Sequence, residues 1–150
     1  MKEEWKDIGI IKGVDYTGMY QVSNYGQVRS LDRYDNLGRF VKGRILKPKI
    51  YKDKKYSKKI YLKVDLSKNN ISSHCSIHRI EAITFELPIP EHLKDIPIDE
   101  LQVDHIDTNP LNNRLDNLRW TDNFGNANNP NTKQHMSEAH KLWWEKHKDN

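Results

Sequence analysis

The sequence is poor in cysteine and has no long apolar run. It contains one cysteine, Cys75, which excludes an internal disulfide and a four-cysteine zinc site. No stretch approaches the roughly 20 apolar residues that span a bilayer, so we expect no membrane role. No apolar stretch follows the first residues, so a signal peptide is not expected. A reducing, cytoplasmic setting fits this composition.

Charge is abundant but unevenly distributed. The 150 residues are 35% hydrophobic and 31% charged, which suits one compact domain or two small ones with a modest core. The net charge is only +4, yet residues 39–63 hold eleven Lys and Arg against a single acid, Asp53. Residues 81–104 hold seven acids against one base, Lys94. The basic block, interleaved with tyrosines, suits a polyanion such as nucleic acid, but a solvated lysine-rich hairpin remains an equal alternative.

Periodicity divides the first two-thirds of the chain. Glycines and tyrosines in residues 5–31 predict short strands and turns, with a hairpin over residues 20–28. Residues 60–66 alternate between apolar and polar side chains and predict a strand, followed by a turn at 68–70 and a second short strand through Cys75 and Ile77. The apolar spacing then changes to that of a helix beginning near Ile77, which Pro88 and Pro90 are expected to stop, with an ordered loop over 88–97.

Residues 101–126 combine a short strand, an Asn-rich loop and a second strand. The first strand ends in adjacent Asp104 and His105, whose side chains are expected to face opposite sides. Residues 118–121 form the second strand, and Asp122 is a suitable N-cap for a helix that carries Asn126 and ends before Pro130. Four asparagines and a glycine make this helix poor by propensity, which favours a site over helix stability. A further helix is predicted over 132–148.

These residues resemble the HNH motif of phage and intron homing endonucleases. The matching pieces are Val103-Asp104-His105, Asn112-Asn113-Arg114, Asp116-Asn117-Leu118-Arg119-Trp120 and Asn126. The helix near Ile77 resembles the one that precedes this motif. Residues 4–8 and 20–31 resemble the nuclease-associated modular motif that often lies upstream. The two resemblances occur in the expected order and cover about two-thirds of the chain.

The resemblance implies an α+β fold. It would comprise a small N-terminal antiparallel β unit with the basic block (1–70), a ββα-metal (His-Me finger) nuclease core (71–130) and a C-terminal helical tail (131–150). It also implies a metal-dependent endonuclease acting on double-stranded DNA in the cytoplasm of a bacterial or phage-infected cell. Whether a monomer nicks one strand or a homodimer cuts both stays open, as does the target sequence.

The resemblance also implies roles for individual residues. Asp104 and Asn126 would bind one divalent cation, His105 would be the general base, and Asn117 would brace the loop and help to orient His105. Carboxylate and amide oxygens suit Mg²⁺ or Mn²⁺, and a neutral histidine can accept a proton from water near pH 7. Hydrolysis would leave 5′-phosphate and 3′-hydroxyl ends.

Two positions depart from the family pattern. Asn126 stands where histidine is frequent, which makes this an HNN variant and favours Mg²⁺ or Mn²⁺ over Zn²⁺. Thr108 stands where the turn often has glycine, so a positive φ there would strain it. His78 is expected to be structural, or a backbone or DNA contact, rather than catalytic.

Basic side chains near the motif and in the basic block are the expected DNA contacts: Arg39, Lys42, Arg44, Lys47, Lys49, Lys52, Arg79, Arg114 and Arg119. Two alternatives remain. The same scaffold could bind DNA or regulate without cleaving, or the Trp143-Trp144 pair could serve a partner-binding protein.

Overall fold

The N-terminal half is built from short antiparallel strands. The computed structural model describes residues 1–52 and 60–122. One three-stranded sheet has the order β1-β4-β5, with two small hairpins beside it. The bounds are β1 Trp5–Asp7, β2 Ile10–Ile11, β3 Val14–Asp15, β4 Tyr20–Ser23, β5 Val28–Ser30, β6 Arg33–Tyr34 and β7 Phe40–Val41. The predicted hairpin over residues 20–28 is confirmed, because β4 and β5 pair antiparallel around the turn that contains Gly26.

A second three-stranded sheet has the order β10-β9-β8, from β8 Lys49–Lys52, β9 Ile60–Lys68 and β10 Ile71–Ser76. Its turn lies at Asn69 and Asn70, which both adopt positive φ, as a tight two-residue hairpin requires. The alternation in β9 buries the side chains of Val64 and Leu66. The turn residues Asn69 and Asn70, which follow the strand, are exposed. Both predicted strands around this turn are therefore confirmed, but the second ends at Ser76, and Ile77 begins the helix that follows.

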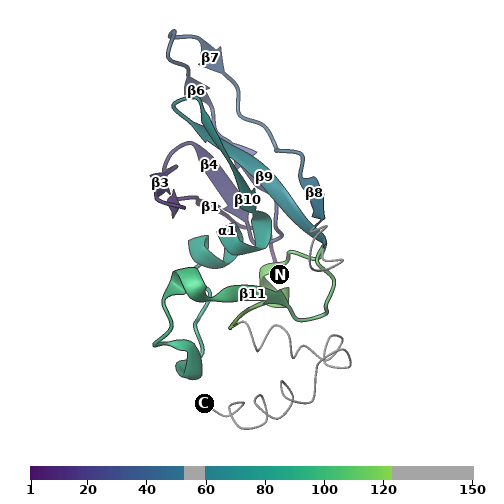
Figure 1. The fold of residues 1–150 in the computed structure, drawn as a ribbon. Coiled ribbons are helices and arrows are strands. Elements are labelled where there is room, and N and C mark those ends of the chain that lie inside the picture. The colour runs from purple at the N-terminus through teal and green to yellow at the C-terminus, as the bar shows by residue number, and fades with distance from the viewer. Residues whose placement is uncertain (53–59, 123–150) are drawn as a thin grey trace.

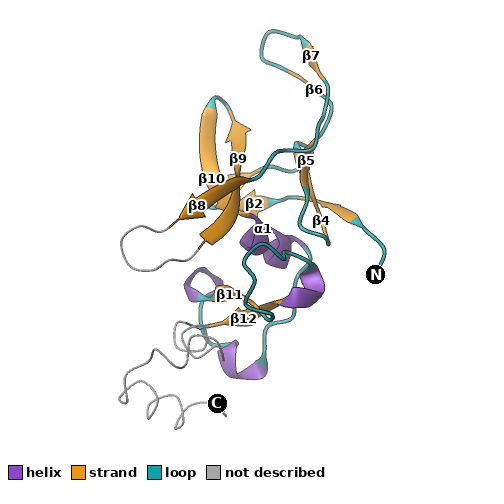
Figure 2. Ribbon diagram, turned by 90° about the vertical axis from the view of Figure 1, so that its right-hand side faces the viewer, coloured by secondary structure: helices purple, strands orange, loops and turns teal. Residues whose placement is uncertain are grey.

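Helix α1 (Ile77–Thr84) follows β10 directly and connects the two halves of the structure. In Figure 1 it lies between the N-terminal sheets and β11, and Figure 2 shows the same order from the side. Ile77 and Ile80 join a core with β4, β5, β9 and β10, whereas Ala82 joins a second core with the C-terminal hairpin. One short helix thus contributes to both cores.

The helix ends earlier than the prolines indicate. Its last residue is Thr84, and the Glu86 N–H donates to the Ile83 carbonyl while the Leu87 N–H donates to Ala82. Glu86 has φ 50°, so these bonds form a Schellman motif around a left-handed residue. Pro88 and Pro90 lie beyond this cap and do not terminate the helix, which corrects the prediction.

The last part of the chain that the structure describes contains a two-stranded sheet of β11 (Gln102–His105) and β12 (Leu118–Thr121). Three single turns of 3-10 helix surround it: η1 Glu91–Leu93, η2 Ile98–Glu100 and η3 Leu115–Asn117. Leu93 and Leu101 pack with Trp120 in the second core, and the Trp120 indole N–H donates to the Leu87 carbonyl at 2.8 Å. The loop over 88–97 is ordered through Leu93, as predicted.

The architecture is the expected α+β mixture. The helix predicted after Asp122, the helix predicted over 132–148 and the Trp143-Trp144 pair lie outside the described residues. Among the described residues, no helix has both the length and the apolar character needed to cross a membrane.

Candidate active site

The β11–β12 hairpin places Asp104 and His105 at the end of one strand. Their side chains face opposite sides because successive residues of a strand alternate. Both are nonetheless buried, at 7% and 6% exposure. Val103 and Trp120 hold this hairpin against α1 through the second core. Because the end of the strand is fixed by this core, Asp104 and His105 are held facing opposite sides and can serve two different roles in one site.

The His105 ring packs on the side of α1. Its Nε2 lies 2.7 Å from Asn113 Oδ1, and since an amide oxygen only accepts, the ring donates Nε2–H. This tautomer leaves Nδ1 as the basic nitrogen. Asn113 is itself 4% exposed, so the contact is shielded from solvent. The sequence contained Asn113 within the motif but gave no reason to prefer it over its neighbours as the partner of His105.

His78 packs against His105 from the first residues of α1. The two ring centroids are 5.0 Å apart, and the Tyr61 ring stacks on His78 at 5.7 Å. Burial, followed by the nearby His105, lowers the pKa of His78 to about 3. A neutral His78 adds no charge beside His105, in accordance with the structural role expected for it.

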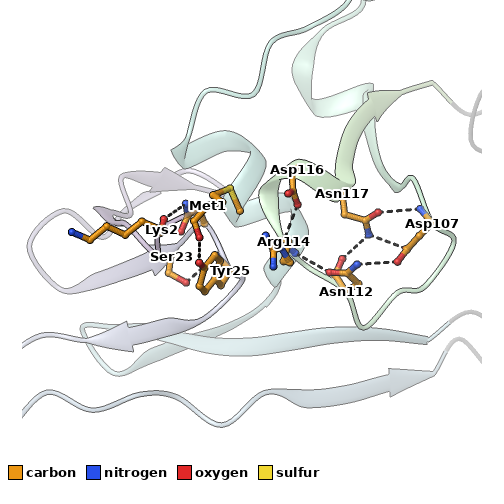
Figure 3. A network of polar contacts seen from close by, with 10 residues as sticks. Met1, Lys2, Ser23, Tyr25, Asp107, Asn112, Arg114, Asp116 and Asn117 are labelled. Atoms are coloured by element: carbon orange, nitrogen blue, oxygen red, sulfur yellow. Dashed lines mark hydrogen bonds and ion pairs between the residues drawn. The ribbon is translucent and has the colours of Figure 1, made fainter.

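The loop between the strands is closed by asparagine side chains (Figure 3). Asn117 Oδ1 accepts the Asp107 N–H at 3.0 Å, while its Nδ2 donates to Asp107 Oδ1 and to the Asn112 carbonyl, both at 2.9 Å. Asn112 Nδ2 also donates to Asp107 Oδ2 at 2.8 Å. The hydrogen bonds that the Asp107 carboxylate accepts, first from the Asn112 amide, then from the Asn109 N–H and the Asn117 amide, lower the pKa of Asp107. Asn117 therefore contacts the loop, and the His105 ring bonds Asn113 instead.

Thr108 occupies the tight turn after His105. Its N–H donates to the His105 carbonyl at 2.9 Å, and its φ is 63°. A β-branched residue rarely adopts this left-handed conformation. A glycine at this position would enter the conformation without strain.

Asp104 lies opposite Arg119 across the hairpin. Asp104 Oδ2 accepts from Arg119 Nη2 at 2.9 Å and from Nε at 3.1 Å. The carboxylate thus already holds a cationic group, so its position suits a positive charge. Within residues 1–52 and 60–122, no three His, Cys, Asp or Glu side chains gather into a metal-binding cluster. Asn126, the second predicted ligand, lies outside the described residues.

The predicted DNA contacts fall into two groups. Lys42, Arg44, Lys47 and Lys52 are exposed on β8 and the segment before it, and Arg39 and Lys49 are exposed but pair with Asp35 and Asp65. Arg79, Arg114 and Arg119 have protein partners near the hairpin. Arg79 donates to the carbonyls of Ile98 and Leu101, and Arg114 pairs with Asp116.

Comparisons with known proteins match the N-terminal and C-terminal regions of the chain to two different families. Residues 3–67 match the NUMOD4 motif, and residues 88–127 match the HNH endonuclease family. A solved structure, described as "DNA binding and cleavage by the HNH homing endonuclease I-HmuI", is 33% identical with a TM-score of 0.61. The alignment covers 97% of this chain and 68% of that one. This chain belongs to the HNH homing endonucleases and carries an N-terminal NUMOD4 motif. No match was found among curated proteins.

Membership of the HNH homing endonucleases makes the chain a nuclease of α+β fold. It confirms the resemblance that the sequence motifs indicated. The individual roles of Asp104, His105, Asn117 and Asn126 remain predictions, as do the domain boundaries at residues 70 and 130.

Proposed function

We propose that this HNH endonuclease hydrolyses phosphodiester bonds of double-stranded DNA with His105 as general base. The observation that supports this role best is the buried bond between His105 and Asn113. That bond keeps the proton on Nε2 and so presents Nδ1 as a base. In the proposed step, Nδ1 takes a proton from water, the oxygen attacks phosphorus, and the bond to the 3′ oxygen breaks. The 3′ oxygen takes up a proton from solvent water, and His105 later releases its proton to solvent, giving 5′-phosphate and 3′-hydroxyl ends.

Asp104 and Asn126 are the residues that would hold one divalent cation, Mg²⁺ or Mn²⁺. A bound cation would offset negative charge on the phosphate oxygens. Asp104 fits this role because it is the residue before His105 at the end of β11, and its carboxylate is paired with the cationic guanidinium of Arg119. Asn117 would act by keeping the loop between the strands closed through Asp107 and Asn112.

We propose that the DNA backbone contacts the basic segment that begins at Arg39 and ends with β8. Lys42, Arg44, Lys47 and Lys52 have no ion pair within the part of the chain that the structure describes. Lysine and arginine displace counterions from phosphates, so such a surface binds DNA without reading its sequence. The I-HmuI similarity supports DNA as the partner.

Plasmid cleavage tests the proposal. Supercoiled DNA incubated with the protein and Mg²⁺ or Mn²⁺ should be nicked or linearised, and EDTA should stop the reaction. His105→Ala should lower the rate at least about 100-fold, since general base catalysis contributes about that much. His92→Ala, an exposed histidine on η1, is the matched control and should cleave normally.

The same assay separates the alternatives. Full activity in His105→Ala would refute the assignment of the base. Salt-dependent DNA binding without cleavage in any divalent metal would instead favour a non-cleaving binding or regulatory protein. The ratio of nicked to linear product at limiting protein distinguishes a monomer with one site from a homodimer with two.

A further inference from the structure

The turn between β4 and β5, in the NUMOD4 region, lies directly against the loop of the HNH region. Gly26 in this turn has φ +84°, and a Cβ added to it would lie 2.6 Å from Asn113 Cβ and 2.8 Å from the Asn113 carbonyl oxygen. Contacts this short are essentially never found between real side chains. The two backbones therefore approach as closely as they do because residue 26 has no side chain.

The residues before Gly26 contact the same loop. The Asn24 carbonyl accepts the Leu115 N–H at 2.9 Å, and the Arg114 guanidinium lies over the Tyr25 ring at 5.2 Å. The Asn24 side chain is fixed by the N-terminal residues of the chain: it accepts the Glu4 N–H at 2.8 Å and donates to the Lys2 carbonyl at 2.9 Å. Three successive turn residues thus contact three successive loop residues, across the boundary between the two matched regions.

The contact between Gly26 and Asn113, at one end of this set, leads to the proposed base. Asn113, against which Gly26 packs, is the residue whose Oδ1 accepts His105 Nε2–H. A shift of a few tenths of an ångström in the Asn113 backbone would lengthen a 2.7 Å hydrogen bond that is buried on both sides. The remaining donor of Asn113, Nδ2, has no hydrogen-bond partner within the described residues, so no second bond resists that shift.

We propose that the 23–26 turn is a positioning element for catalysis, with Gly26 setting the place of Asn113 and thereby the orientation and tautomer of His105. The inference rests on the proposed function, in which His105 is the base. It makes the NUMOD4 region part of the active-site support, in addition to any contact that it makes with DNA.

A matched pair of glycine variants tests the proposal. Gly26→Ala places a Cβ against Asn113 and also strains a positive φ. Gly18→Ala strains a positive φ of +80° in the same region but has open space around its Cβ. At saturating DNA and Mg²⁺, Gly26→Ala should reduce kcat about 10- to 100-fold below Gly18→Ala, the range expected when the support of a catalytic group is lost. The Kd for DNA should be the same in both. Equal kcat values in the two variants would overturn the proposal.

A double variant separates positioning from general destabilisation. Asn113→Ala removes the bond to His105, so adding Gly26→Ala should slow cleavage no further, whereas independent effects would multiply. Multiplying losses would contradict the proposal. The ring ¹⁵N shifts of His105 supply a readout that a purely structural role would not move: Gly26→Ala should reduce the Nε2–H tautomer, and Gly18→Ala should not.

If Gly26→Ala does not fold, Tyr25→Leu disturbs the same contact more gently by removing the ring beneath Arg114. It should lower kcat about 3- to 10-fold with unchanged Kd, and no loss would count against the proposal.

Failure of the inference is distinguishable from failure of the proposed function. An inactive His105→Ala with a normal Gly26→Ala refutes only the positioning role, whereas an active His105→Ala refutes the base itself.

Discussion

At the scale of single residues, the Glu81 carboxyl group is unusual because it is fully buried in α1. Neither of its oxygens has a hydrogen-bond partner among the described residues. Burial, with a smaller contribution from Asp116, raises the pKa of Glu81 to about 9. The folded protein therefore keeps this group protonated at neutral pH, whereas the unfolded chain releases the proton near its ordinary pKa of 4.5.

This difference predicts a pH dependence of stability. Above pH 4.5 the folded state binds one more proton than the unfolded state, so the stability contributed by Glu81 is lost as pH rises towards 9. His78, whose pKa is lowered from 6.5 to about 3, has the opposite slope below pH 6.5. Between pH 6.5 and 9 only Glu81 of this pair acts, at up to about 1.4 kcal/mol per pH unit.

Glu81→Gln should remove that alkaline slope. Urea unfolding at several pH values between 6.5 and 9 should show a free energy of unfolding that falls less steeply in the variant than in the wild type. At pH 8 the variant should also be the more stable of the two, because its amide needs no proton to remain neutral. An unchanged slope would mean that Glu81 ionises normally in the folded state.

The sequence predicted which residues form the site, but not all of the contacts between them. The motif pattern gave the Asp104-His105 pair at a strand end and Asn117 as a residue of the loop, and the described contacts place them there. It did not indicate that Asn113 bonds the His105 ring, because several asparagines share this loop and only its three-dimensional path selects one. The Gly26 contact spans 87 positions of sequence and had no local signal.

At the scale of elements, a strand could be predicted where apolar and polar residues alternate or where turn residues mark its end. The alternation in β9 and the asparagine turn before β10 indicated that hairpin, and similar short signals indicated β11 and β12. Strands β6, β7 and β8 were not located from the sequence. They are short, and their residues are mostly exposed on both faces, so no alternation between apolar and polar positions marks them.

The end of α1 gives a prediction at this scale. Glu86 is exposed and holds φ 50° in the Schellman motif, where glycine avoids the steric cost of a Cβ. Glu86→Gly should therefore raise the free energy of unfolding by about 1 kcal/mol. Thermal and urea unfolding would measure this change. Glu91→Gly on η1, where no left-handed residue is needed, is the control and should not stabilise.

At the scale of the whole molecule, positive charge is concentrated on one segment while the HNH region is acidic before the motif. Lys42→Gln and Lys47→Gln together should weaken DNA binding at all sequences alike. The slope of log K against log salt should fall by about one per lysine that contacts phosphate. Fluorescence anisotropy over a salt series measures both quantities.

Lys94→Gln removes one positive charge within the acidic stretch, as each of the two substitutions does in the basic segment, and serves as the control. It should leave the salt slope unchanged. An equal effect of all three substitutions would indicate that net charge, and not the basic segment, governs binding.

Strand β8 is the outer strand of its sheet, and all four of its residues are exposed, including Ile50 and Tyr51. An open strand edge with apolar side chains is a template for pairing between copies of a chain, and lysines are a common protection against such aggregation. Lys49 and Lys52 stand at the two ends of β8. Solubility at high protein concentration therefore depends on the same charges that we assign to DNA, and neutralising them carries a risk of fibre formation that is separate from any loss of binding.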